Sequence, residues 1–420
     1  MSTTPTTNNT NNNSILIIGA GISALTLAQG LHSHKIPFRI FERSPTLPTN
    51  GYRFRLVDEA LSALQKTLPG SLWKDLSATH PLSSVPNFQL FDAKTLSRSA
   101  VFPAKEEESW PVDRPWVLRL LVRGIEDRIS FGKECIGFEV LGGGGEEGGG
   151  GGRGVRVKFQ DGMEVDGRMV IGADGIHSSI RRKYLPEVKL LDLERTIMWG
   201  RTPLTTALEA GLGRELFEEH YSCVLDQEGS ITRSMLFAPV RWPAGGKISG
   251  FVEGNGVVDQ EDYVFWALKF ETTGEGGKGR GLQTQEGRRE VALRLTSSWD
   301  RRLRAVFENM AVSSAIPVWS NKLDIPEWGD DDRVTFMGDA VHALAPSGGA
   351  GGVLAVLDAA ELCDVLKGCW DEGRWVGLED GLRGYQVNVR ERAKGAIERG
   401  FENGKILWDG KDWFEYGYVE

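Results

Sequence analysis

The segment from residue 15 to residue 42 constrains the fold more than any other part of the chain. Ile15 to Ile18 form a short apolar run that ends at Gly19, which is typical of a buried strand in a parallel sheet. Apolar residues then recur at near-helical spacing from 25 to 31, and an alternating apolar run covers 38–41. The pattern predicts a strand, helix and strand in succession, and therefore an α/β fold.

The turn between the first strand and the helix reads Gly-Ala-Gly-Ile-Ser-Ala, which fits G-x-G-x-x-G/A. Gly19 permits a tight turn, Gly21 lets a pyrophosphate approach the helix N-terminus, and Ala24 allows close helix packing. Glu42 ends the second strand, where its carboxylate can accept hydrogen bonds from ribose hydroxyls. These features predict FAD or NAD rather than NADP at this turn. The alternative is a tight turn in an unrelated α/β domain.

Two later segments show related patterns. Residues 170–181 form a buried-type strand that runs into a Gly/Asp turn and a basic segment, although a plain strand-to-helix turn would look similar. Residues 333–337 form another strand, which leads to Gly338, Asp339 and a glycine-rich stretch at 347–352. An apolar helix over 353–366 follows.

Composition excludes several classes of protein. A chain of 420 residues points to two or three domains, and 40% apolar with 25% charged residues is typical of a folded globular protein. The net charge of -9 disfavours nucleic-acid binding. The four cysteines make no C-x-x-C pair, so we expect no metal site, no disulfide framework and a reducing, cytoplasmic location.

Some segments are expected to lie outside the folded core. Residues 1–13 lack charged residues and are rich in Thr and Asn, which predicts a disordered tail. The apolar stretch 15–31 is interrupted by polar residues and no basic residue precedes it, so we expect neither a signal peptide nor a membrane span. The glycine tract 142–154 separates two alternating runs, 136–140 and 155–159, and predicts a long hairpin loop.

The glycine turn, the segment GADGIHSSIR and the segment GDAVHALAPSGGAGG together resemble the FAD-dependent aromatic-ring monooxygenases, the single-component flavoprotein hydroxylases with the para-hydroxybenzoate hydroxylase fold. The resemblance spans residues 15–366, with no diagnostic motif between about 186 and 325. It implies a Rossmann-type FAD-binding domain formed by 14–75, 112–185 and 326–370. It also implies a β-sheet substrate domain inserted as 76–111 and 186–325, and a C-terminal helical segment over 371–420.

The resemblance also implies the roles of individual residues. Asp339 is expected to bind the ribitol, Glu42 the adenosine ribose, and Asp174 the FAD pyrophosphate region and the transient nicotinamide site. The expected cofactor-binding residues are Gly19, Gly21, Ala24, Glu42, Arg43, Arg55, Arg119, Asp174, Gly175, Gly338, Asp339, Pro346, Gly349, Gly351 and Gly352. Arg119 can instead be a solvated helix arginine. Val353 stands where many relatives have Asn, which removes any flavin contact made by that side chain.

The family's chemistry is oxygen insertion through a flavin C4a-hydroperoxide, with NAD(P)H as the reductant. A helix that begins near 349–352 would direct its positive end toward the flavin pyrimidine and stabilise negative charge on the reduced ring. The chain has no second nucleotide-binding turn in a strand-to-helix context, so no separate NADPH domain is expected.

The substrate is expected to be an aromatic or polyketide-like small molecule. The aromatic residues in the expected substrate domain are Trp199, Phe237, Trp242, Phe251, Phe265 and Trp266. They can equally form a sheet core. Arg201 resembles a pocket arginine that steadies a phenolate in some fungal relatives and is the catalytic candidate, while Arg53 and Arg55 can line the flavin's other edge. All three can instead be structural ion-pair partners.

Two other functions are compatible with the sequence. One is a flavoprotein reductase or dehydrogenase of the same fold that does not use oxygen. The other is an FAD-binding redox sensor without turnover, suggested by Val353 and the weak match at Arg119. Oxygen-dependent, substrate-stimulated NAD(P)H oxidation separates both from a monooxygenase.

Overall fold

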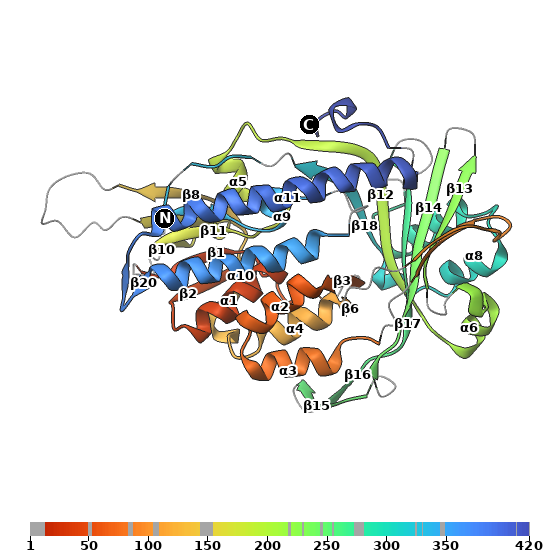
Figure 1. Ribbon diagram of the computed structural model, residues 1–420, viewed down its shortest axis with the longest axis horizontal. Coiled ribbons are helices and arrows are strands. Elements are labelled where there is room, and N and C mark those ends of the chain that lie inside the picture. The colour runs from red at the N-terminus through yellow and green to blue at the C-terminus, as the bar shows by residue number, and fades with distance from the viewer. Residues whose placement is uncertain are drawn as a thin grey trace, which may run out of the picture.

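Figure 1 shows the computed structural model of the protein. The residues that it describes are 13–48, 53–82, 87–103, 109–142, 154–216, 220–228, 231–243, 247–253, 256–272, 281–323, 326–329, 331–344, 349–408 and 410–419. Residues 1–12 of the tail expected at 1–13, residues 143–153 of the glycine tract and Pro346 lie outside these ranges.

A five-stranded parallel sheet forms one half of the molecule. Its strands, in spatial order, are β19 (Val334–Phe336), β11 (Met169–Gly172), β1 (Ile15–Ile18), β2 (Phe38–Glu42) and β7 (Ile129–Phe131). Ile15 lies beside Met169 on one side and Phe38 on the other. The run at 15–18 is fully buried because both faces of the sheet are covered, as a continuous apolar strand requires.

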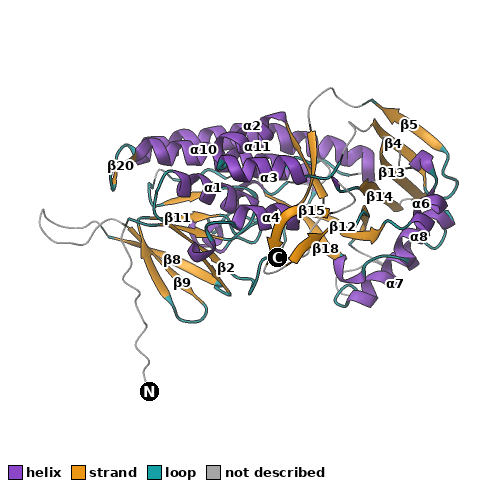
Figure 2. Ribbon diagram, turned by 90° about the horizontal axis from the view of Figure 1, so that it is seen from below, coloured by secondary structure: helices purple, strands orange, loops and turns teal. Residues whose placement is uncertain are grey.

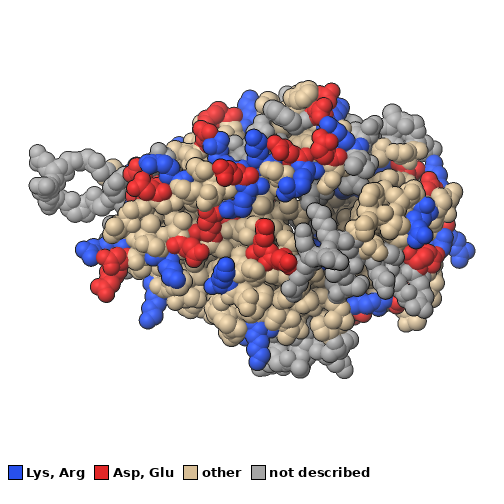
Figure 3. Space-filling view, in the orientation of Figure 1, with Lys and Arg blue, Asp and Glu red and all other residues tan. Residues whose placement is uncertain are grey.

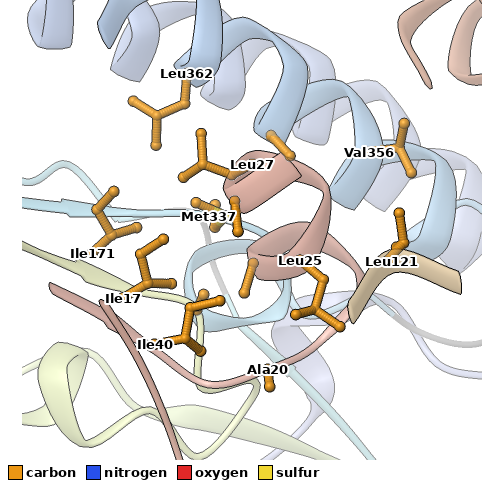
Figure 4. Packing of buried hydrophobic residues seen from close by; sticks show 14 of the residues in the cluster. Ile17, Ala20, Leu25, Leu27, Ile40, Leu121, Ile171, Met337, Val356 and Leu362 are labelled. Atoms are coloured by element: carbon orange, nitrogen blue, oxygen red, sulfur yellow. The ribbon is translucent and has the colours of Figure 1, made fainter. Parts of the chain in front are cut away.

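Helices cover one face of this sheet. They are α1 (Ile22–Ser33), α2 (Asp58–Thr67), α3 (Gly70–Thr79), α4 (Arg114–Val122), α10 (Gly351–Cys369) and α11 (Leu378–Trp408). Figure 4 shows Leu25 and Leu27 of α1 between the strands and α10. α1 and α10 pack so closely that a Cβ on Gly30 would lie 2.3 Å from the sulfur of Cys363. The helices predicted around 25–31 and over 353–366 are therefore present, and both are slightly longer than the apolar patterns that predicted them.

A three-stranded antiparallel sheet covers the opposite face (Figure 2). It consists of β8 (Cys135–Leu141), β9 (Gly154–Phe159) and β10 (Glu164–Gly167). β8 and β9 pair in antiparallel fashion, so the hairpin predicted on either side of the glycine tract is confirmed. The short helix α5 (Ser179–Tyr184) contacts β8, and α9 (Asp339–His342) follows β19.

The second half of the molecule is built on a seven-stranded mixed sheet. Its strands, in spatial order, are β18 (Ile316–Leu323), β12 (Leu190–Pro203), β17 (Tyr263–Glu271), β14 (Ile231–Val240), β13 (His220–Glu228), β4 (Asn87–Asp92) and β5 (Arg98–Phe102). β4 pairs with β13 in parallel although they are far apart in the sequence. All seven strands fall within the ranges expected for the substrate domain, whose limits remain a prediction.

The two faces of this sheet pack against different partners. The outer face packs on α6 (Thr206–Leu212), α7 (Gln285–Leu295) and α8 (Arg301–Glu308). Phe237 and Trp266 belong to this outer core. Trp199 and Phe265 lie on the inner face, where their rings stack with their centres 5.6 Å apart. Trp242 lies edge-on to Trp116 of α4. Phe251 lies in β15, and its side chain is outside the described part of the structure.

The remaining elements are short. They are the pairs β3 (Arg53–Val57) with β6 (Ser109–Asp113), β15 (Lys247–Glu253) with β16 (Gly256–Asp259), and β20 (Trp370–Asp371) with β21 (Arg374–Trp375), and the 3-10 turns Glu126–Arg128, Arg214–Leu216, Val312–Ser314 and Trp413–Glu415. β3 and β6 lie between the two halves. Acidic and basic side chains alternate over the face in Figure 3. Among the described residues, no helix is both long and apolar enough to cross a membrane.

Candidate functional site

The three glycine-containing turns meet at the carboxyl ends of neighbouring parallel strands. The amide of Ala173 donates to the Ile18 carbonyl at 2.9 Å, and the amide of Met337 donates to the Gly172 carbonyl at 3.0 Å. The turns after β1, β11 and β19 are therefore held side by side. In open α/β sheets this edge is where ligands bind.

A cavity of about 390 Å³ lies at this edge. It is lined by Ile18, Gly19, Ala20, Gly21, Ile22, Ser23, Phe41, Glu42, Arg43, Ser44, Pro48, Phe54, Arg114, Lys133, Glu134, Cys135, Ala173, Asp174, Gly175, His177, Ser179, Arg182, Asp339, Gly351, Gly352 and Ala355. The structure thus brings together nine predicted residues: Gly19, Gly21, Glu42, Arg43, Asp174, Gly175, Asp339, Gly351 and Gly352.

Gly19 and Gly21 are required for different reasons. Gly19 has a φ of +102°, and a Cβ there would lie 2.4 Å from the Ala173 carbonyl oxygen. Gly21 has a φ of -79° and precedes α1, and a Cβ there would meet nothing within 4 Å. Gly19 therefore serves the contact between two turns, whereas Gly21 leaves space in the cavity at a helix N-terminus.

Glu42 is fixed at the end of β2 by two backbone amides. Its Oε2 accepts from Ala20 N at 2.8 Å, and its Oε1 accepts from Ser44 N at 2.8 Å. Each carboxylate oxygen has a second lone pair that can accept another hydrogen bond. The side chain is thus positioned as an acceptor for hydroxyl groups in the cavity.

Asp174 offers an acceptor that the described protein groups do not satisfy. Its Oδ2 accepts from the amide and the hydroxyl of Ser179, at 2.7 and 3.0 Å. Its Oδ1 is buried and has no hydrogen-bond partner among the described residues. A buried polar atom without a partner is costly, so this oxygen fits a ligand that donates a hydrogen bond.

Asp339 begins α9 and faces the cavity. Gly338 before it has a φ of +58°, and a Cβ on Gly338 would lie 3.2 Å from Ser23 Oγ. Burial raises the pKa of Asp339, and the positive charges of His342 and Arg114 oppose this shift. Its carboxyl group is therefore in a site where hydrogen bonds from a ligand would compensate for lost hydration.

A cluster of three charged side chains, His342, Asp358 and Arg392, supports the turn that carries Asp339. His342 Nε2 and Asp358 Oδ2 are 2.5 Å apart, and the same oxygen accepts from Gly338 N at 2.9 Å. Arg392 of α11 donates to the other oxygen of Asp358 at 3.1 Å. Burial opposes the charge on both partners, yet their interaction raises the pKa of His342 and lowers that of Asp358.

Arg181 links the second motif to the third. Its Nη1 donates to the Ala340 carbonyl at 2.7 Å, and its Nη2 donates to the Ile176 carbonyl at 2.6 Å. The residue is buried, and burial lowers its pKa to about 10. One side chain therefore fixes two of the cavity turns relative to each other.

The long helix α10 begins at the cavity. Ala350 is its N-cap, and Gly351 and Gly352 line the cavity. The positive end of the helix dipole thus faces the site. Val353 packs against the core, so this position has an apolar structural role.

Several predicted cofactor residues do not line the cavity. Ala24 is buried within α1, and Gly338 packs behind Asp339. Gly349 has a φ of +61° in the loop before α10. Arg55 lies on β3, where its Nη2 donates to the Ser109 carbonyl at 3.1 Å. Arg119 is half-buried on α4.

Sequence reasoning missed other cavity residues, including Arg114, His177 and Arg182. Arg114 is the first residue of α4, whose N-cap Asp113 accepts from Trp116 N at 3.0 Å. Burial, followed by the nearby arginines, lowers the pKa of His177.

The catalytic candidate Arg201 lies away from this cavity. It is exposed on β12, on the inner face of the seven-stranded sheet, and its guanidinium carbon is 5.8 Å from the centre of the Tyr263 ring. Its catalytic role stays a prediction.

Comparisons with known proteins agree with this arrangement. A protein-family model described as FAD binding domain matches residues 262–399. The dual O-methyltransferase/FAD-dependent monooxygenase elcB of Phaeosphaeria nodorum is 30% identical over 97% of this chain, but the chain spans only 47% of that relative. The FAD-dependent monooxygenase aptC of Emericella nidulans is 25% identical over 92% of this chain and 93% of its own length.

Solved structures show the same fold. A putative FAD-containing monooxygenase from Photorhabdus luminescens has a TM-score of 0.74 at 20% identity, covering 94% of this chain and 98% of its own. Klebsiella pneumoniae HpxO in complex with FAD and uric acid has a TM-score of 0.69 at 17% identity, covering 94% and 88%. These solved structures show that the chain has the para-hydroxybenzoate hydroxylase fold, and the family model and the relatives show that its sequence is similar to those of FAD-dependent monooxygenases.

Proposed function

We propose that this chain is an FAD-dependent monooxygenase that uses NAD(P)H and O2 to insert one oxygen atom into an aromatic or polyketide-like small molecule. The observation that carries the proposal is the convergence of three turns from distant parts of the sequence on one cavity. The names of the relatives, which describe them as FAD-dependent monooxygenases, support it.

The residues of the cavity fit FAD. Glu42 would accept hydrogen bonds from the adenosine ribose, Asp339 from the ribitol, and Asp174 would use its unpaired Oδ1 toward the ligand. Gly21 leaves space for the pyrophosphate at the N-terminus of α1. When bound, the flavin supplies hydride acceptance and oxygen activation.

The seven-stranded sheet would cover the reacting end of the site. Trp199 and Phe265 stack on its inner face, toward the half that carries the cavity. An apolar aromatic wall both binds planar rings and excludes water. The chain's own contribution is thus to bind the cofactor, orient the substrate and keep the reaction dry.

A comparison of three proteins tests the proposal. The wild type, Asp339→Asn and Asp380→Asn, an exposed carboxylate on α11, are purified and their bound flavin is measured. We expect flavin in the wild type and in the α11 variant, and a large loss in Asp339→Asn. NAD(P)H oxidation and O2 uptake are then measured with a panel of phenols.

Substrate-stimulated O2 uptake, with ¹⁸O from labelled dioxygen in the product, is the expected result. Flavin binding with substrate-stimulated NAD(P)H oxidation that needs no oxygen would favour a reductase or dehydrogenase. Flavin binding without stimulation by any phenol would favour a redox sensor. A wild-type chain without flavin would refute the proposal altogether.

A further inference from the structure

We propose that the junction between the two halves holds an anion site centred on Arg53, which binds a carboxylate group of the substrate. The inference rests on the proposed function and specifies its substrate class. It starts from a buried arginine, two of whose three guanidinium nitrogens have no hydrogen-bond partner among the described residues.

Arg53 is 5% exposed on β3, and its Nε and Nη1 atoms have no hydrogen-bond partner in the described part of the chain. Its neighbour across the ladder is Asp113 of β6, whose carboxylate is already engaged. One oxygen accepts from Trp116 N at 3.0 Å, and the other accepts from the Tyr263 hydroxyl at 2.7 Å. A buried guanidinium without a paired carboxylate lowers the stability of the folded protein. Such a group is expected at a site where a bound ligand supplies the missing hydrogen bonds and charge.

The surroundings of Arg53 add further positive charge. Arg55 lies two residues along β3 on the same face, and burial together with the charge of Arg53 lowers its pKa to about 10. Arg201 reaches the Tyr263 ring from the facing sheet, and the positive charges of Arg201 and Arg119 both act on the buried carboxylate of Asp113. An anion would balance this excess.

The aromatic neighbours suit an aromatic anion. The guanidinium carbon of Arg53 is 5.0 Å from the centre of the Tyr221 ring, on the inner face of the seven-stranded sheet. Burial raises the pKa of Tyr221 despite the nearby arginines, so its phenol stays neutral near pH 7 and does not supply the missing charge.

The site lies beside the cofactor cavity without being part of it. Phe54 lies between the two arginines in the sequence, and its side chain points to the opposite face of β3, where it lines the cavity. It packs closely on Gly352: a Cβ added to Gly352 would lie 2.6 Å from the Phe54 ring. One strand therefore separates the arginines from the cofactor loop. A substrate oxygen held by Arg53 would place the rest of the molecule between β3 and the aromatic wall.

Acid and ester pairs test this site in the FAD-loaded chain. The probes are 2,4-dihydroxybenzoate, 1,4-dihydroxy-2-naphthoate and anthraquinone-2-carboxylate, each with its methyl ester, and binding is followed by the flavin absorbance. We expect at least one acid to bind about tenfold or more tightly than its ester. Arg53→Met should abolish this preference and Arg53→Lys should keep part of it, while Arg374→Met, at an exposed position, should change nothing.

A second measurement separates ligand binding from a structural role. Without ligand, Arg53→Met should melt at the same temperature as the wild type or higher, because it removes a buried charge that lacks a counter-ion. The proposal is overturned if no acid is preferred, if the preference survives in Arg53→Met, or if this variant melts well below the wild type. Loss of FAD from Arg53→Met would also overturn the proposal, because it would indicate that Arg53 binds a negatively charged group of the cofactor and not of the substrate. Wild-type chain that binds no FAD would instead refute the proposed function.

Discussion

Replacing Gly19 and Gly21 separately by alanine tests whether the two glycines of the first turn have distinct roles. At Gly19, a Cβ would lie 2.4 Å from the Ala173 carbonyl oxygen, and the φ of +102° is unfavourable for any L side chain. Positive φ costs about 1–2 kcal/mol and overpacking about 1–3 kcal/mol. The expected loss for Gly19→Ala is therefore about 2–5 kcal/mol of the free energy of unfolding, even without cofactor.

Gly21→Ala should behave differently. The new Cβ meets no atom within 4 Å, and the φ of -79° is ordinary. The stability of the flavin-free protein should stay within about 0.5 kcal/mol of the wild type. The methyl group occupies space that the proposed pyrophosphate needs, so FAD should bind at least about tenfold more weakly, a change of about 1.4 kcal/mol.

Two measurements on flavin-free protein distinguish the variants. Melting temperature should fall by about 4–10 °C in Gly19→Ala, at about 2 °C per kcal/mol, and stay unchanged in Gly21→Ala. Titration with FAD, followed by quenching of flavin fluorescence, should show weakened binding in Gly21→Ala. Equal melting temperatures for Gly19→Ala and the wild type, or an equal loss of stability in both variants, would refute the reasoning.

Three further changes probe the rest of the site. The pKa of His342 is raised in the folded protein, so its contribution to stability is complete below about pH 6.5 and is lost as the pH rises through the folded-state pKa. The melting temperature of the wild type should therefore fall toward alkaline pH more steeply than that of His342→Gln, and parallel curves would contradict this. Arg114→Met should weaken FAD binding, measured by fluorescence titration, more than Arg119→Met, because only Arg114 lines the cavity; the reverse order would restore Arg119 as the flavin arginine. Arg181→Met removes two hydrogen bonds from a charged donor, each worth about 1.5–3 kcal/mol, and should lower both the melting temperature and flavin retention. An unchanged melting temperature would show that the two turns hold their places without it.

The parts of the fold that are determined by residues close together in the sequence could be predicted. The strand at 15–18, its turn and its helix follow from local periodicity and glycine spacing, and the hairpin of β8 and β9 follows from two alternating runs. The helices α6, α7 and α8 were not predicted, because the middle region lacks a motif and its strands dominated the pattern. The parallel pairing of β4 with β13 joins distant segments and leaves no local signal.

The choice between two arginines shows a limit of the same kind. Arg114 and Arg119 lie five residues apart on α4, which is about 140° around the helix axis. Which of them faces the cavity depends on how the helix packs against its neighbours, and a single sequence does not contain that rotation. The unpaired donors of Arg53 are likewise visible only when β3 and β6 are placed against the second sheet.

The order of the strands has a consequence for synthesis of the chain on the ribosome. β19, at the edge of the parallel sheet, is translated only at residues 334–336, and β4 pairs with β13, which is translated more than a hundred residues after it. Neither sheet can complete its strand pairing before the later strand has been translated. Until then, the unpaired edge strand exposes backbone N–H and C=O groups that can pair with other chains. Assembly therefore waits for most of the polypeptide to emerge, and fragments cut before β19 should need chaperones to avoid aggregation.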